Sequence, residues 1–161
     1  MKLIKKSFKR TDASADSTNM YIFTDNGDRT SGNGKIDDNS EYSIRFGKKG
    51  LKYPSVTSAI IRGLSNAYPI TTQKKYFPGN KSKEGNWTDD DFEEFKKVID
   101  DDIEHIKNAC VEKGYKEIIF PYNGILNGRI SKLTIERTPK LYKYIIEKEI
   151  ELAKFKSNES N

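Results

Sequence analysis

The chain has 161 residues, 34% of them hydrophobic and 33% charged, so its length fits one domain with a lean core. The formal net charge is +5, but the first ten residues hold five lysines and arginines and no acid, so the rest of the chain is nearly neutral and disfavours a nucleic-acid surface there. A single cysteine excludes an intramolecular disulfide and a cysteine-based zinc site, a single histidine excludes the common histidine-rich metal sites, and no apolar run is long enough for a membrane span.

The first half of the chain is predicted to alternate between short apolar segments and polar loops. Residues 1–19 have little to bury and are typical of a flexible basic arm. The apolar run 20–23 predicts a buried strand, followed by a polar loop at 24–37 and a short helix within 39–50. Pro54 can begin another helix, with apolar residues at helical spacing as far as Leu64. Residues 67–71 predict a second strand, and Pro69 favours an edge strand or a strand end.

The second half carries the clearest helix signals. Residues 72–87 predict a long basic loop, after which Thr88 is a typical cap for an amphipathic helix that ends at Gly114. Residues 116–121 predict a third strand, and Thr138 followed by Pro139 marks the start of a long final helix. Alternating strands and helices predict an α/β fold, with a sheet of three or more strands flanked by helices. We expect one domain over residues 20–156 and a disordered tail at 157–161.

Two loops rich in glycine and asparagine each follow a predicted strand. TDNGDRTSGNG follows MYIF, and YNGILNGR follows KEIIF. Ligands of open α/β sheets bind at the carboxyl ends of the strands, and glycine lets backbone amides approach a phosphate closely. Arg29 and Arg129 can each clamp an anion. Either loop alone is more simply an ordinary turn, but the pair favours a ligand site.

We predict that the ligand-binding residues come from these two loops and from the segment around the second strand. They are Thr24, Asp25, Asn26, Arg29, Thr30, Ser31, Gly32, Arg62, Asn66, Thr72, Gln73, Asn123, Gly124, Asn127, Gly128 and Arg129. Asp25 or Asp28 can accept hydrogen bonds from a ribose or a base. If the ligand is hydrolysed, these two acids or Glu41 are the catalytic candidates.

Other conspicuous residues have simpler explanations. Trp87 and Tyr76 in the basic loop can stack on a base or form a lid, but a loop anchored by its tryptophan is the better interpretation. Residues 100–102, three consecutive aspartates, are typical of a solvated helix face. Cys110 continues the apolar stripe of its helix and is expected in the core, while His105 is not expected to be a general base.

Several stretches resemble a family of uncharacterised proteins from large tailed bacteriophages, over about residues 20–155. They are YIFTDNGDRTSG, YPSVTSAIIRGLSNAYPITTQ, WTDDDFEEFKKVIDDDIEHIK, and IIFPYNGILNGRIS with RTPKLYKYI. The resemblance implies a phage origin and a cytoplasmic setting in the infected host cell, without an assigned reaction.

Two stretches are also similar, more faintly, to macro-domain-like proteins. They are FTDNGDRTSGNG and FPYNGILNGR, which would match the first ligand loop and the later phosphate loop. This likeness implies a three-layer fold, Rossmann-like or macro-domain-like, and a ligand related to ADP-ribose. The second loop departs from the macro-domain pattern, because it lacks a compact glycine cluster.

Three functions follow from these features. The first is a non-catalytic protein that binds a nucleotide-derived small molecule, ADP-ribose-like or a cyclic nucleotide, and sequesters a host defence signal. The second is a hydrolase acting on a nucleotide or nucleoside, of the glycosidase or ADP-ribose hydrolase type. The third is a binder of nucleic acid or of a host protein that acts through the basic arm. We expect no cofactor, no metal and no membrane partner, while a host defence component as partner and a homo-oligomer both remain open.

Overall fold

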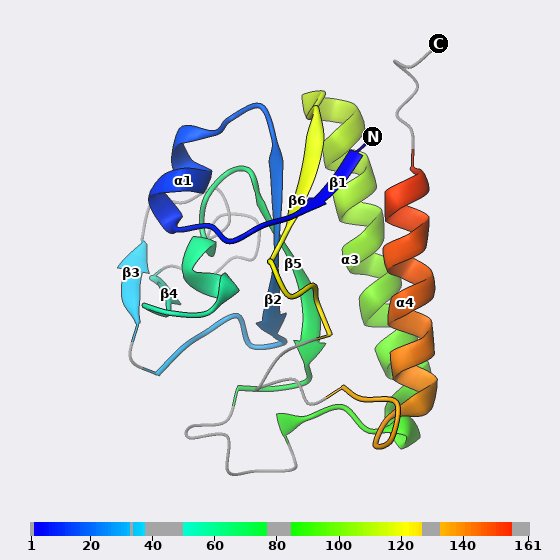
Figure 1. Cartoon of the computed structure of the whole chain (residues 1–161). Coiled ribbons are helices and arrows are strands. Elements are labelled where there is room, and N and C mark those ends of the chain that lie inside the picture. Colours follow the sequence, from blue (N-terminus) through cyan, green and yellow to red (C-terminus); the bar gives the residue numbers. More distant parts are fainter. Residues whose placement is uncertain (1, 33, 38–49, 77–84, 127–132, 156–161) are drawn as a thin grey trace.

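The computed structural model describes residues 2–32, 34–37, 50–76, 85–126 and 133–155. Four parallel strands form one sheet in the order β1-β6-β2-β5 (Figure 1). These strands are β1 (Lys2–Lys5), β2 (Met20–Asn26), β5 (Ala67–Gln73) and β6 (Glu117–Phe120). A separate antiparallel pair consists of β3 (Lys35–Asp37) and β4 (Leu51–Tyr53). The predicted α/β fold is therefore confirmed.

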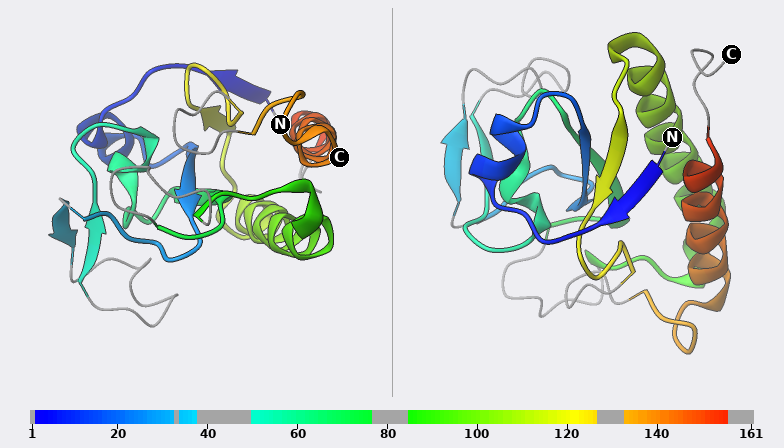
Figure 2. Two further views of the ribbon diagram at one scale, coloured as in Figure 1. Left: turned by 90° about the horizontal axis from the view of Figure 1, so that it is seen from below. Right: turned by 45° about the horizontal axis from the view of Figure 1, so that its top comes forward.

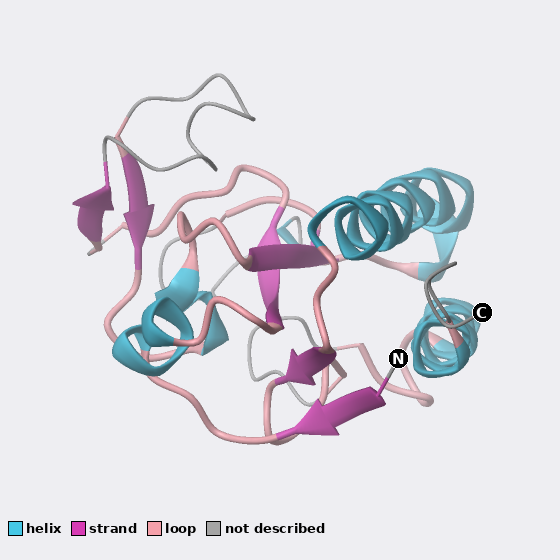
Figure 3. Cartoon of the chain, turned by 90° about the horizontal axis from the view of Figure 1, so that it is seen from above, coloured by secondary structure: helices cyan, strands magenta, loops and turns pink. Residues whose placement is uncertain are grey.

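Helices cover both faces of the sheet and make three layers. The long helices α3 (Phe92–Lys113) and α4 (Pro139–Lys154) lie on one face. The short helix α1 (Arg10–Ala15) and the 3-10 helix η1 (Ser58–Ile61) lie on the other (Figures 2 and 3). Strand β2 explains why both faces of the sheet are covered, because it presents apolar side chains alternately to one face and to the other. Met20 and Ile22 pack toward α3 and α4, whereas Tyr21 and Phe23 pack toward α1 and η1.

The predicted ends of the two long helices are confirmed. The backbone N–H of Thr88 donates to the carboxylate of Asp91 at 3.0 Å, which closes a capping box at the 3-10 turn η4 (Asp89–Asp91) before α3. Gly114 ends α3 with a left-handed φ of 62°. Asp89 accepts hydrogen bonds from the backbone N–H groups of Lys140 and Leu141 at the start of α4, so one carboxylate joins the ends of two helices.

The first 19 residues differ from the predicted flexible arm. Lys2–Lys5 pair in parallel with Glu117–Phe120 and make β1 an edge strand of the sheet. Leu3 is half-buried against the α3–α4 side of the core, and Ile4 against the opposite side. Four residues are too few to show the alternation that identifies a strand, so the basic composition dominated the prediction.

The helix predicted from Pro54 is wrong, because only residues 58–61 are helical and they form a 3-10 turn. Thr57, just before the turn, has a φ of 96°, and Gly63, just after it, has a φ of 101°, so the backbone leaves the helical region at both ends. The apolar spacing is satisfied differently. Ala59 and Ile61 are buried, while Val56 is 74% exposed.

The other organisational predictions have mixed outcomes. Pro69 does lie in an edge strand, because among the strands that the structure describes β5 pairs with β2 alone. The helix predicted within 39–50 lies outside the described residues except for residue 50. The tail at 157–161 lies wholly outside them. No helix in the described part of the chain is long and apolar enough to cross a membrane. The same residues contain no group of three or more histidine, cysteine or acidic side chains that could hold a metal ion.

Candidate functional site

The two predicted loops leave neighbouring central strands in opposite directions. After β2 the chain turns toward the face that carries α1 and η1, whereas after β6 it continues to α4 on the other face (Figure 1). A parallel sheet opens a crevice at such a switch point, at the carboxyl ends of its strands. The sheet topology is therefore the one that the ligand-site prediction requires.

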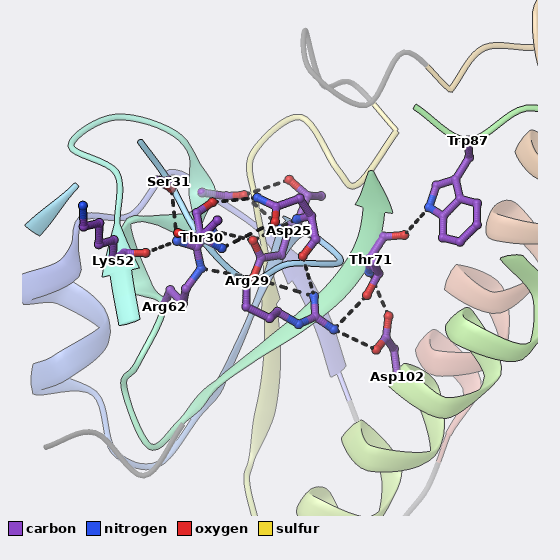
Figure 4. Close-up of polar contacts among 12 residues, drawn as sticks. Asp25, Arg29, Thr30, Ser31, Lys52, Arg62, Thr71, Trp87 and Asp102 are labelled. Atoms are coloured by element: carbon purple, nitrogen blue, oxygen red, sulfur yellow. Dashed lines mark hydrogen bonds and ion pairs between the residues drawn. The ribbon is translucent and has the colours of Figure 1, made fainter. Parts of the chain in front are cut away.

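At the end of β2, Asp25 lies in a buried ion pair (Figure 4). Its side chain is fully buried, and Arg62 donates to both carboxylate oxygens, with Nε at 3.1 Å from Oδ2. The same guanidinium donates to Ser31 Oγ at 3.1 Å and to the carbonyl of Lys52 in β4. Arg62 thus joins the first loop, β4 and the end of β2 into one rigid unit.

Arg29 extends this network toward α3. Its Nη2 donates to Thr71 Oγ1 at 2.8 Å and lies 3.5 Å from Asp102 Oδ1, while its Nη1 lies 3.7 Å from Asp25 Oδ2. The backbone N–H of Thr71 donates to the other oxygen of Asp102 at 2.8 Å (Figure 4). Two arginines and two aspartates therefore neutralise each other inside the protein. We call Asp25, Arg29, Arg62 and Asp102 the buried charge network.

Burial raises the pKa of Asp102 to about 6, although Arg29 and the hydrogen bonds from Thr71 act in the opposite direction. The ordinary pKa of an aspartate is 3.8, so the folded protein binds this proton more tightly than the unfolded chain does. The contribution of Asp102 to stability is therefore greatest below about pH 4 and is lost as the pH rises through about 6.

We expect Asp102→Asn to remove this pH dependence. Between pH 4 and pH 7, the free energy of unfolding of the variant should rise relative to that of the wild type by about 2 kcal/mol, at about 1.4 kcal/mol per pKa unit. Urea denaturation across this range measures the difference. Glu104→Gln, at an exposed position two residues further along α3, should run parallel to the wild type. If the free energy of unfolding of Asp102→Asn instead fell relative to that of the wild type as the pH rises, Arg29 would be keeping Asp102 ionised.

The glycines of the first loop are explained by packing against the chain after β5. A Cβ on Gly27 would lie 2.3 Å from the carbonyl oxygen of Lys74, and one on Gly32 would lie 2.3 Å from the hydroxyl of Tyr76. The backbone N–H of Gly32 donates to that hydroxyl at 2.7 Å, and the backbone N–H of Tyr76 donates to Asp28 at 3.0 Å. The loop is therefore fastened to residues 74–76 by close contacts that glycine permits.

The remaining predicted residues of the first half are dispersed. Thr24 contacts Ser58 beside the network, and Asn26 closes the turn by donating to the carbonyl of Thr30 at 2.7 Å. Thr72 and Gln73 are buried in β5. Asn66 lies just before β5, at the amino ends of the strands rather than at their carboxyl ends. Its amide donates to the carbonyls of Ala13, Asp16 and Asn19, which is a structural role far from the crevice.

Trp87 is an anchor and not a stacking platform. It is 2% exposed, its indole N–H donates to the carbonyl of Thr71 at 3.0 Å, and its ring meets Phe95 edge-on at 5.4 Å. Cys110 is buried in the core, as predicted. The prediction for residues 100–102 is wrong at Asp102, which is buried, whereas Asp101 is exposed and Asp100 contacts Tyr144 and Lys148 of α4.

A cavity of about 730 Å³ lies where β1 and β6 end beside α4. We call it the β1–β6 cavity. It is lined by residues of β1, of the chain between β6 and α4, and of α4, among them Lys5, Asn123, Gly124, Tyr142, Ile146 and Glu149. Its size is typical of small-molecule sites. Two predicted ligand residues, Asn123 and Gly124, therefore line a cavity, whereas Asn127, Gly128 and Arg129 of the same loop lie outside the described residues.

Lys5 and Glu149 form an ion pair in the wall of this cavity. Lys5 Nζ lies 2.8 Å from Glu149 Oε1, which joins the end of β1 to α4. Gly124 has a left-handed φ of 76°, and a Cβ there would lie 3.4 Å from Lys5 Nζ. Neither Lys5 nor Glu149 was predicted, because a lysine in a basic segment and a glutamate in a charged helix carry no signal until the sheet order places them together.

A scan against protein families matches residues 3–148 to a family described as "Family of unknown function (DUF7831)". No curated protein and no solved structure matches the chain. The family match begins within β1, covers the other strands of the sheet, and ends within α4. Because it spans most of the chain, the protein belongs to the DUF7831 family of unknown function.

Proposed function

We propose that the protein binds a nucleotide-derived small molecule, of the ADP-ribose-like or cyclic-nucleotide class, in the β1–β6 cavity. The observation that carries the proposal is the composition of this cavity at the carboxyl ends of two parallel strands. An ammonium group, a left-handed glycine, two carboxylates and an apolar wall with a tyrosine line the same space. Each of these groups suits one part of a nucleotide.

Lys5 and Gly124 suit a phosphate. The 3.4 Å between Lys5 Nζ and the position of a Cβ on Gly124 means that an anion against the backbone of Gly124 would also reach the ammonium. A glycine at this position leaves the backbone open to the ligand. Glu149 now occupies the ammonium, so a phosphate would have to replace or share that partner.

Two carboxylates, of Glu136 and Glu149, suit the hydroxyl groups of a ribose, which acidic residues accept in other nucleotide sites. With Lys5 as the one cation among the described lining residues, the wall carries more negative than positive charge. This balance favours a ligand with many hydroxyls and few phosphates, and it disfavours a nucleic-acid backbone. Tyr142 and Ile146, both half-buried in α4, supply a surface for the base.

Binding without turnover is favoured over hydrolysis by the contacts of the candidate acids. Asp25 is fully buried and held by Arg62, and Asp28 accepts the backbone N–H of Tyr76. Glu41 lies outside the described residues. A protein that holds a nucleotide without converting it would sequester that molecule. We infer that the molecule sequestered is a host defence signal.

The matched variants Lys5→Gln and Glu149→Gln test the proposal. Both break the same ion pair, but only the first removes the cation that binds the phosphate. Thermal unfolding with ADP-ribose, AMP and cyclic AMP should show ligand stabilisation of the wild type, of about 2.7 kcal/mol at a hundredfold excess over the dissociation constant. We expect Lys5→Gln to lose most of this stabilisation, whereas Glu149→Gln keeps or increases it.

Lys96→Gln, at an exposed position on α3, is the control for loss of one positive charge and should behave as the wild type. Two results would overturn the proposal. One is that no ligand of the three raises the melting temperature. The other is that both ion-pair variants lose binding equally, because the ion pair would then serve the fold alone.

A further inference from the structure

A second cavity, of about 510 Å³, lies on the opposite side of the molecule from α4, between α1, the β3–β4 pair and the chain before η1. Its lining includes Arg10, Lys35, Tyr53, Pro54 and Ile60. None of the residues that line it also lines the β1–β6 cavity. We call it the Arg10 cavity. The function proposed above does not use it.

Arg10 is held in one orientation by four contacts. Its Nη1 donates to the carbonyls of Ile60 at 3.0 Å and Arg62 at 2.7 Å, and its Nη2 donates to Asp37 at 2.6 Å. The guanidinium also lies 3.8 Å from the centre of the Tyr53 ring. Among the described residues these bonds use three of its five N–H groups, so Nε–H and one N–H of Nη2 remain for a ligand.

The charges and surfaces of this cavity favour an anion with an apolar body. Arg10 and the exposed Lys35 both line it, and no described lining residue carries a carboxylate, although Asp37 binds Arg10 beside it. Pro54 and Ile60 provide a half-buried apolar wall. This composition is the reverse of the β1–β6 cavity, whose lining holds more acids than bases.

We propose that the Arg10 cavity binds a small organic anion, a phosphate or carboxylate attached to a flat apolar group, independently of the β1–β6 cavity. The anionic group contacts Lys35 and the remaining N–H groups of Arg10. The apolar group lies against Pro54 and Ile60. Because Arg10 already stacks on Tyr53 and is fixed by its acceptors, the protein orders little on binding.

The test is an NMR titration of the 15N-labelled full chain with four probes: phenyl phosphate, benzoate, phenol and inorganic phosphate. We expect phenyl phosphate or benzoate to shift the amides of residues 10–15 and 53–60, with a dissociation constant on the order of 1 mM. Phenol lacks the charge and inorganic phosphate lacks the ring, so each should bind at least about tenfold more weakly. The stronger of the two organic anions identifies the head group.

Variants locate the site. Lys35→Gln should lower the affinity for the tighter-binding organic anion about fivefold, which is the most that an exposed charge pair usually contributes. Lys96→Gln, and Lys5→Gln in the β1–β6 cavity, should leave its affinity unchanged. The proposal is overturned if neither organic anion shifts these amides, if phenol binds equally well, or if Lys35→Gln has no effect. Loss of nucleotide binding in Lys5→Gln concerns the other cavity and leaves this result unaffected.

Discussion

Replacing Arg62 with methionine is expected to lower the free energy of unfolding by about 3–5 kcal/mol. The side chain of Asp25 is fully buried and would lose both hydrogen bonds from the guanidinium. Arg29, 3.7 Å away, would remain beside Asp25, but it is shared with Asp102. An uncompensated charge in the interior is costly because water no longer solvates it. Urea denaturation at pH 7 measures the loss.

Two further variants separate charge from packing. Arg137→Met, at an exposed position, should change the free energy of unfolding by no more than about 0.5 kcal/mol. The double variant Arg62→Met with Asp25→Leu removes both charges and should recover at least half of the loss. A cost below about 1 kcal/mol for Arg62→Met alone would contradict a buried pair.

Trp87→Ala is the second substitution with a large expected effect, a loss of about 3–5 kcal/mol in the free energy of unfolding. The ring is 2% exposed against Phe95, and its N–H satisfies the carbonyl of Thr71 in β5. Truncation leaves a cavity and an unpaired carbonyl next to the buried charge network. Chemical denaturation again provides the measurement.

Trp87→Phe distinguishes an anchor from a nucleotide lid. It keeps most of the apolar volume and loses the hydrogen bond to Thr71, so we expect a cost of about 1 kcal/mol and unchanged nucleotide affinity. Trp87 does not line either cavity. If Trp87→Ala kept its stability but no longer bound nucleotides, the ring would be a stacking platform after all.

Elements with local signals were predictable from the sequence. Thr88 and Gly114 delimit the helical segment that contains α3 by side-chain and backbone chemistry within a few residues, and Pro139 can occupy only the first turn of α4. The edge position of β5 is one of the two that Pro69 indicated, because proline lacks the N–H that a central strand needs. These features do not depend on what the segment packs against.

Features that depend on distant partners were missed. β1 is a strand because β6, more than a hundred residues away in the sequence, pairs with it. Asp102 is buried because Arg29 and Thr71 meet it, and nothing in a run of aspartates indicates which one will face inward. The helical spacing after Pro54 was a real apolar pattern, but the left-handed backbone at Thr57 prevents the helix.

The candidate site was half predictable. Topology confirmed that both glycine-rich loops leave the carboxyl ends of adjacent strands, as their pattern indicated. At the first loop, however, Arg29 and Arg62, the residue after η1, bind Asp25 and Asp102, so their charges serve the fold. The proposed ligand therefore lies at the second loop, where Lys5 from an unpredicted strand completes the cavity.

The measurement that tests this account most directly is an NMR titration of the 15N-labelled protein with ADP-ribose and with cyclic AMP. We expect at least one of them to shift the amides of Lys5, Gly124 and Tyr142 saturably, and Lys5→Gln to weaken that binding. Shifts confined to residues 24–32, or no saturable shift with either nucleotide, would contradict a nucleotide site in the β1–β6 cavity.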